Sequence, residues 1–296
     1  MNDRTLGFLS MLASTLFFSA TSTLIRLAPG IDPFKTSLFR FAIGLTLLGT
    51  AAMSRRIRLD FHNPALLFAR GLTGGVSVFL FFWSINAIGL GKGTLLSYTY
   101  PVFAAIWGVL LLGERVSPRT WGLILLSFFG VALTSAGRGE DLLTAIGLNE
   151  LLALAGGMLS GLAIVIVRKL RATESSYAIF FSQCVVGFWL MLIPANVLPS
   201  DIGIGGGFIL LGIGVTAAIG QLLMTYSYKA LSASQGSVIA LVTPVANIAI
   251  GMAVFGETVT TVSAAGMVLV LTSCLLIGLE KEQKKRPQGS AALASA

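Results

Sequence analysis

The chain has 296 residues, of which 55% are hydrophobic and only 11% charged, and its mean hydropathy is +0.88. Soluble domains carry about 25% charged residues, so this composition excludes an ordinary water-soluble protein and favours one whose solvent is the lipid bilayer. The net charge of +8 is spread over short segments between apolar stretches, which argues against nucleic-acid binding as the reason for it.

Apolar stretches long enough to cross a bilayer follow one another along the chain, since a spanning helix needs roughly 20 mostly apolar residues. We predict ten spans: Leu6–Leu27, Phe34–Met53, Pro64–Ile88, Gly93–Leu112, Thr120–Ser135, Leu148–Val167, Tyr177–Val197, Gly207–Tyr228, Gly236–Phe255 and Val262–Leu279. The first is longer than the apolar core of a secretory signal peptide, so we expect it to remain as a membrane helix. The predicted fold class is all-α integral membrane.

The distribution of basic residues predicts the orientation. Most Lys and Arg residues lie in segments on the N-terminal side of the membrane, whereas the opposite loops carry only Lys35, Lys92 and Arg138. The positive-inside rule therefore predicts both termini in the cytoplasm, with the protein in the cytoplasmic (inner) membrane. Residues 281–296 are charged and then rich in small residues, which is typical of a disordered cytoplasmic tail.

The two halves of the chain repeat one another. Sliding residues 84–116 by 143 positions onto 227–259 aligns nine identical residues, which include Pro101 with Pro244 and Glu114 with Glu257. Five spans in the first half reverse the direction of the second, so residues 1–139 and 140–280 are predicted to be inverted five-helix repeats around a central cavity. Matching hydrophobic segments interrupted by Gly and Pro are typical of secondary transporters.

The repeated motifs resemble a known family. The run 93–101 (GTLLSYTYP) is followed by 112–115 (LGER), and the run 236–244 (GSVIALVTP) is followed by 255–257 (FGE). These motifs are similar to those of the EamA family of the drug/metabolite transporter superfamily, and the resemblance covers nearly the whole chain. It implies ten helices, a central cavity between the halves, and transport of a small metabolite such as an amino acid, amine, nucleoside or vitamin.

Polar and aromatic side chains on the repeated spans define the predicted substrate site, because a few polar groups among large aromatic ones suit a small-molecule pocket. The predicted lining is Phe79, Phe82, Trp83 and Asn86 on the third span, Ser97 and Tyr98 on the fourth, Gln221, Thr225 and Tyr228 on the eighth, and Thr243 and Asn247 on the ninth. The alternative is lipid contact or helix packing for each aromatic residue, and interhelical hydrogen bonding for each amide.

Two arginines lie inside predicted spans. Arg40 is within the second span, and because charge inside a membrane is costly and usually functional, we expect it to face the cavity or a gate. It would suit a zwitterionic or anionic substrate. The alternative is that its side chain extends to the membrane surface, which is what we expect of Arg70 near one end of the third span.

The repeat aligns two prolines with each other and two glutamates with each other, and each kind of residue has its own prediction. Pro101 and Pro244 lie inside spans, where proline bends a helix, so each is either a fixed kink or a hinge that lines the cavity. Glu114 and Glu257 lie at span ends on opposite sides of the membrane. We expect structural roles for them, either capping the following helix or pairing with a neighbouring cation, with proton coupling as the alternative.

The sequence offers no chemistry for an enzyme. His62 is the only histidine, Cys184 and Cys274 lack metal-ligand spacing, and there is no phosphate-binding glycine-rich loop, so we expect no catalytic residues, metal or cofactor. The prediction is a secondary transporter that moves a small polar or amphipathic metabolite by alternating access. Its partners are that substrate, the lipid bilayer and an optional proton or other coupling ion, and it is a monomer or homodimer. The alternatives are a channel-like facilitator and a drug/proton antiporter.

Overall fold

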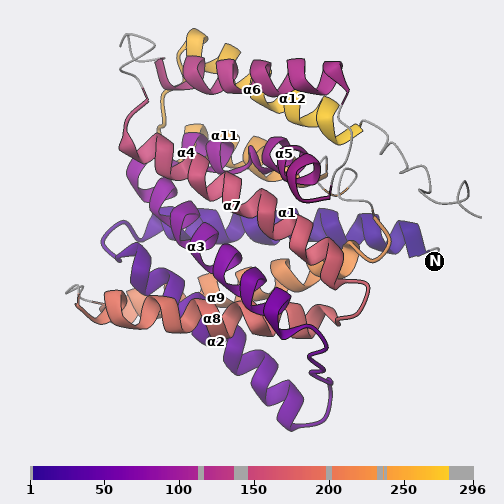
Figure 1. Cartoon of the computed structure of the whole chain (residues 1–296). Coiled ribbons are helices and arrows are strands. Elements are labelled where there is room, and N and C mark those ends of the chain that lie inside the picture. Colours follow the sequence, from indigo (N-terminus) through magenta and orange to yellow (C-terminus); the bar gives the residue numbers. More distant parts are fainter. Residues whose placement is uncertain are drawn as a thin grey trace, which may run out of the picture.

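The computed structural model describes residues 3–112, 117–136, 146–197, 202–231, 236 and 239–279, and this part of the chain is helical, without a β-strand (Figure 1). The helices are α1 (Asp3–Leu27), α2 (Pro33–Met53), α3 (Pro64–Ile88), α4 (Leu90–Ser97), α5 (Tyr100–Leu112), α6 (Pro118–Ala136), α7 (Leu148–Leu170), α8 (Ser176–Val197), α9 (Ile204–Ser227), α11 (Val242–Phe255) and α12 (Thr261–Leu279).

Length and hydropathy identify membrane-crossing helices. Among the described residues, seven segments are long and apolar enough to cross a membrane, namely α1, α2, α3, the segment formed by α4 and α5, α7, α8 and α9, and shorter apolar helices lie in α6, α11 and α12. Helices suit a bilayer because they satisfy their backbone hydrogen bonds internally. The all-helical, multi-pass membrane class is therefore confirmed, whereas the count of ten spans stays a prediction.

The predicted fourth span is two helices rather than one. Helix α4 ends at Ser97, and α5 begins at Tyr100, so that Pro101 lies in the first turn of a new helix. In the second half, α11 begins at Val242 after a turn at Leu241, and Pro244 lies in its first turn. Proline is tolerated there because the first backbone N–H groups have no partner within the helix. The prediction that each proline bends one continuous span is thus corrected.

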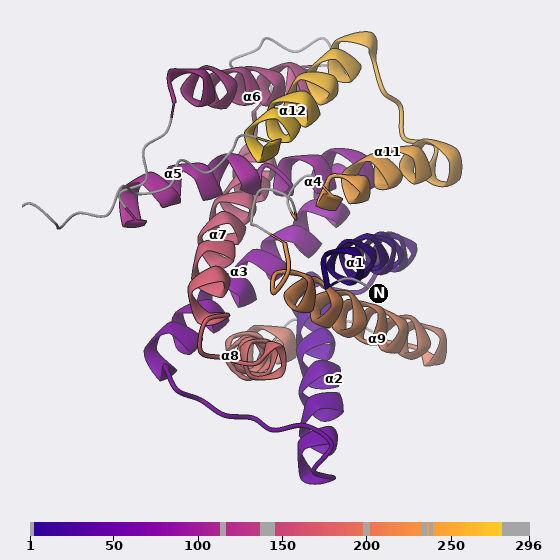
Figure 2. The ribbon, with the colours of Figure 1, turned by 90° about the vertical axis from the view of Figure 1, so that its right-hand side faces the viewer.

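The helices form layers that both views show (Figures 1 and 2). Helices α6 and α12 pack together at one edge, and α2 and α8 pack together at the other. Between them, α1 packs on α9, α3 packs on α7, and the shorter α4 packs on α11. Helix α3 also packs against α8. The interior of the bundle therefore combines helices from the two halves of the sequence.

Glycines set the close approach of α2 and α8. A Cβ on Gly44 would lie 2.7 Å from Cys184 Sγ of α8, and a Cβ on Gly187 would lie 2.6 Å from the ring of Phe41 on α2. Gly44 and Gly187 are 143 positions apart, and so are Phe41 and Cys184. The contact is therefore reciprocal: Gly44 of α2 faces Cys184 of α8, and Gly187 of α8 faces Phe41 of α2.

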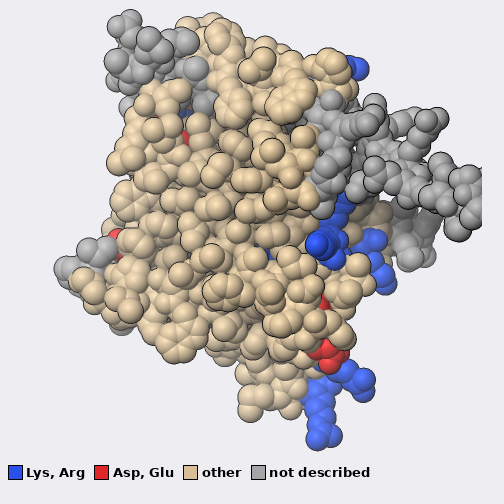
Figure 3. Space-filling view, in the orientation of Figure 1, with Lys and Arg blue, Asp and Glu red and all other residues tan. Residues whose placement is uncertain are grey.

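The charged side chains lie mainly at one end of the bundle, which we call the N-terminal end because α1 begins there. Figure 3 shows Lys and Arg gathered on that side. The exposed basic residues at its helix ends are Arg55, Arg56 and Arg58 after α2, Arg119 in α6, Arg168 and Lys169 in α7, and Lys229 after α9. At the opposite end, Arg26 and Lys92 each pair with a carboxylate.

Candidate functional site

Two arginines from neighbouring helices are buried in the interior. Arg40 of α2 is only 3% exposed and Arg70 of α3 only 4%. Arg40 Nη2 donates to Gln221 Oε1 of α9 at 3.4 Å, and Arg70 Nη2 donates to Gln183 Oε1 of α8 at 3.1 Å. The expectation that Arg70 extends to the membrane surface is therefore wrong in this structure, because α8 covers the side chain and supplies an amide partner.

Neither guanidinium is fully satisfied. Within the described residues, Arg40 Nη1, Arg70 Nε and Arg70 Nη1 are buried without a hydrogen-bond partner. The guanidinium carbon of Arg40 lies 5.4 Å from the ring centre of Phe41 and 5.9 Å from that of Phe82, so two aromatic faces offset part of the cost of its burial. Arg70 lies against Gly74, where any Cβ would overlap its Nη1 atom.

Several predicted residues surround this pair. Phe82 is 2% exposed and faces Arg40, while Gln221 contacts both Arg40 and, through its Nε2 atom at 3.4 Å, Thr225 Oγ1. The structure therefore brings Arg40, Phe82, Gln221 and Thr225 into one buried cluster with Arg70. We call Arg40, Arg70, Gln183 and Gln221 the arginine–amide cluster.

A second group of predicted residues lies where α4 meets α11. Asn247 Nδ2 donates to Thr94 Oγ1 at 3.0 Å, and Asn247 Oδ1 is buried with no hydrogen-bond partner among the residues that the structure describes. Thr243 Oγ1 lies 3.4 Å from the carbonyl oxygen of Thr15 on α1, and Ser97 Oγ lies 3.3 Å from Ser84 Oγ on α3. These bonds tie the broken helices of both halves to α1 and α3.

The predicted tyrosines lie in the same region. Tyr98 and Tyr228 both pack against the buried cluster of Tyr100, Ile164 and Ala240. The ring centres of Tyr98 and Tyr100 are 5.7 Å apart in an edge-on arrangement. Tyr98, at the break between α4 and α5, and Tyr228, at the end of α9, thus pack against the same cluster.

The remaining residues predicted on α3 lie elsewhere. The ring of Phe79 stacks on Phe34 with centres 4.2 Å apart, and Trp83 Nε1 donates to Asn149 Oδ1 of α7 at 3.1 Å. Asn86 lies near the end of α3, where its backbone carbonyl oxygen accepts a hydrogen bond from Arg26 Nη1 at 3.4 Å. These three residues therefore contact different helices, because α2, α7 and α1 each pack against a different part of α3.

Glu257 joins three helices at the end of the bundle opposite the N-terminal end. Its carboxylate accepts from the backbone N–H of Leu90 at 2.5 Å and of Gly91 at 2.9 Å, and it lies 3.6 Å from Arg26 Nε. It thus caps α4 of the other half rather than the following helix α12, which corrects the predicted capping partner. Glu114 lies outside the described residues.

Local backbone geometry explains this reach. Gly256 has a φ of 62°, in the left-handed region that favours glycine, and Glu257 N donates back to Gly251 O at 3.0 Å. This turn places the carboxylate beside Gly251, where a Cβ would lie 2.6 Å from Glu257 Oε2. The prediction of a capping role identified the chemistry of Glu257, but the turn decides which helix receives it.

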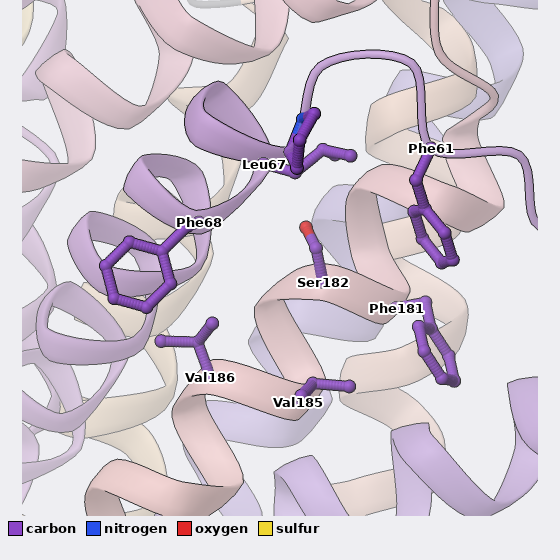
Figure 4. Close-up of a pocket in the computed structure, with 8 residues that line it drawn as sticks. Phe61, Leu67, Phe68, Phe181, Ser182, Val185 and Val186 are labelled. Atoms are coloured by element: carbon purple, nitrogen blue, oxygen red, sulfur yellow. The ribbon is translucent and has the colours of Figure 1, made fainter.

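An apolar groove lies apart from these clusters. It has a volume of about 230 Å³ and lies between the start of α3 and α8 (Figure 4), where it is lined by Phe61, Pro64, Leu67, Phe68, Phe181, Ser182, Val185 and Val186. The hydroxyl of Ser182 donates to the carbonyl of Ile179, which leaves the lining with little polar capacity. No predicted site residue lines this groove, and the predicted central cavity stays a prediction.

The sequence interpretation missed Arg70 and Gln183 as site residues. The signal for Gln183 was present, because it matches Arg40 at the repeat offset of 143. Arg70 carries no comparable signal, since its position six residues into α3 suits a residue that reaches the membrane surface equally well.

A helical membrane bundle that buries polar groups from both halves has the architecture of a membrane transporter. The profile of the EamA-like transporter family matches residues 5–136 and again residues 148–279. The chain therefore belongs to the EamA-like transporter family, whose members are transporters and not enzymes.

Similar proteins agree with this membership. The pseudopaline exporter CntI of Pseudomonas aeruginosa is 26% identical over 284 residues, which cover 93% of this chain and 97% of the exporter. A riboflavin transporter of Vibrio cholerae is 25% identical and covers 77% of this chain and 78% of its own length. A crystal structure with a TM-score of 0.62 and 18% identity, which covers 92% of this chain and 94% of its own, is similar in fold.

Proposed function

We propose that the protein is a secondary transporter that moves a small polar or amphipathic metabolite across the cytoplasmic membrane by alternating access. The observation that carries this proposal is the arginine–amide cluster. It brings α2 and α3 of the first half to α8 and α9 of the second through hydrogen bonds of 3.4 and 3.1 Å. Polar groups buried inside a membrane bundle are costly and mark pathways for substrates and ions.

Reciprocal packing supports two inverted halves. In the repeat, α1 corresponds to α7 and α3 corresponds to α9. Helix α1 packs on α9, and its counterpart α7 packs on α3, the counterpart of α9. Gly44 and Gly187 likewise face counterpart positions across the α2–α8 contact. An exchange of this kind is what a pseudo-two-fold axis between two repeats produces. The axis would pass between α2 and α8.

The broken helices support movement near the site. The gap between α4 and α5 and the turn before α11 leave backbone groups outside regular helical bonding. Discontinuous helices near the middle of the membrane are typical of the sites of secondary transporters. Pro101 and Pro244 thus act as hinges at which one helix segment tilts against the next.

The charge distribution supports the orientation. The exposed basic residues at the N-terminal end of the bundle (Figure 3) match the positive-inside pattern, which supports our proposal that both termini lie in the cytoplasm. At the opposite end, two basic residues are neutralised by Glu257 and Glu150.

Counterflow in proteoliposomes tests the proposal. Vesicles with the full-length protein are loaded in turn with unlabelled amino acids, organic anions, amines, nucleosides or vitamins, and the labelled solute is added outside at trace concentration. A transporter accumulates label transiently and saturably, whereas protein-free vesicles do not. Flux that never saturates and shows no counterflow would indicate a channel. Uptake of cationic drugs driven by a pH gradient would indicate a drug/proton antiporter.

A further inference from the structure

We infer that Arg40 and Arg70 together bind an anionic substrate, one that presents a carboxylate or phosphate group to both guanidinium groups. This inference rests on the proposed transport function and narrows its substrate class. It goes beyond the prediction from Arg40 alone, because only the folded chain shows that Arg70 is buried in the interior as well.

Charge balance is the first argument. Arg40 and Arg70 are 3% and 4% exposed, and among the described residues the ion pairs with carboxylates involve Arg26, Lys92 and, when protonated, His62, but neither buried arginine. Arg70 bonds Gln183 of α8, and the next residue, Cys184, packs against Gly44, one helical turn after Arg40 on α2, so α8 holds both arginines in the same region of the interior. Among the described residues neither arginine has a counter-ion, and because a buried charge without one is costly, the cluster favours the arrival of an anion.

Hydrogen-bonding capacity is the second argument. A guanidinium has five N–H donors and no acceptor, and each arginine in the cluster uses one nitrogen on a neutral amide. Arg40 Nη1, Arg70 Nε and Arg70 Nη1 remain buried without partners in the described part of the chain. Carboxylate and phosphate oxygens accept several such bonds at once, which makes them the matching ligands.

The surrounding residues keep the donors available. A Cβ on Gly74 would overlap Arg70 Nη1, so this glycine leaves room for the guanidinium beside the backbone of α3. Gln183 and Gln221 each present a carbonyl oxygen to an arginine, and an uncharged amide cannot neutralise it. A cationic substrate would meet two positive charges here, so amines and cationic drugs are excluded from this site.

Binding is measured by thermal stabilisation, separately from transport, which the counterflow assay measures. The melting temperature of the full-length protein in detergent is followed against succinate, citrate, inorganic phosphate, leucine, uridine, choline and chloride at constant ionic strength, because a ligand of the native state raises it saturably. We expect saturable stabilisation by one of the organic anions or phosphate, none by choline, and none by chloride at the same concentration. Stabilisation by choline, uridine or chloride alone, or by none of the solutes, would overturn the inference.

Variants then assign the site. Arg40→Gln and Arg70→Gln should each weaken anion binding about 10–100-fold, since each removes a charged hydrogen-bond donor. Arg56→Gln, in the exposed loop after α2, is the matched control and should bind as the native protein does. If the Gln variants fail to fold, Arg40→Lys and Arg70→Lys replace them, because lysine keeps the positive charge but lacks the planar set of donors. The Lys variants should still bind the anion more weakly than the control does. Unchanged anion affinity in both arginine variants would overturn the assignment.

The two readouts separate this inference from the proposed function. Anion binding that depends on both arginines, without counterflow of any solute, would refute the transport proposal and keep the site. Saturable counterflow of a neutral solute or a cation, unaffected by either substitution, would keep the transport proposal and refute the anion site.

Discussion

Replacing Glu257 with Gln removes the charge that joins α1, α4 and α11 at the end opposite the N-terminal end. The carboxylate accepts two backbone N–H groups from the start of α4 and lies 3.6 Å from Arg26 Nε. A hydrogen bond to a charged group contributes about 1.5–3 kcal/mol, and Gln retains one acceptor oxygen, so one such bond is lost. The side chains of Arg26 and Glu257 are 27% and 18% exposed, so solvent screening limits their pair to about 0.5–1 kcal/mol.

Together these terms predict a loss of about 2–4 kcal/mol for Glu257→Gln. At roughly 2–4 °C per kcal/mol for a chain of this size class, the apparent melting temperature should fall by roughly 4–16 °C. The assay is thermal unfolding of the purified protein in detergent. Arg26→Gln is the matched control, which should lose the ion pair and the 3.4 Å hydrogen bond to the backbone carbonyl of Asn86 but keep the cap of α4, and the double variant should fall below Glu257→Gln only by the Asn86 bond. A melting temperature of Glu257→Gln within 1 °C of the native value would refute the capping role.

Three further predictions concern packing and buried polar groups. Gly187→Ala should cost about 1–3 kcal/mol, because its Cβ would lie 2.6 Å from the ring of Phe41, whereas Gly49→Ala, with open space around it, should be neutral or stabilising in the same thermal assay. Arg70→Met should raise the melting temperature of the ligand-free protein, since it removes unpartnered buried donors, and it should abolish stabilisation by anions; a lower melting temperature would contradict this. Trp83→Phe should lose about 1 kcal/mol with the indole hydrogen bond of 3.1 Å to α7, again by thermal unfolding, and no loss would show that the bond contributes nothing.

The sequence by itself determined the membrane class and most helix positions. The predicted span Pro64–Ile88 coincides with α3, and Phe34–Met53 differs from α2 by one residue. The reason is local: a backbone in lipid must bond within its own segment, so an apolar run of spanning length becomes a helix wherever it lies. The internal repeat also marked the regions where Pro101 and Pro244 interrupt the helices.

Only the tertiary structure decided which polar groups meet. Arg40 and Gln221 are 181 positions apart, and Glu257 and Leu90 are 167 positions apart. An arginine six or seven residues inside a span either reaches the membrane surface or stays buried, and its own neighbours in sequence do not choose between these outcomes. The choice for Arg70 depends on α8 covering α3 and presenting Gln183, which is a property of helix packing rather than of any local pattern.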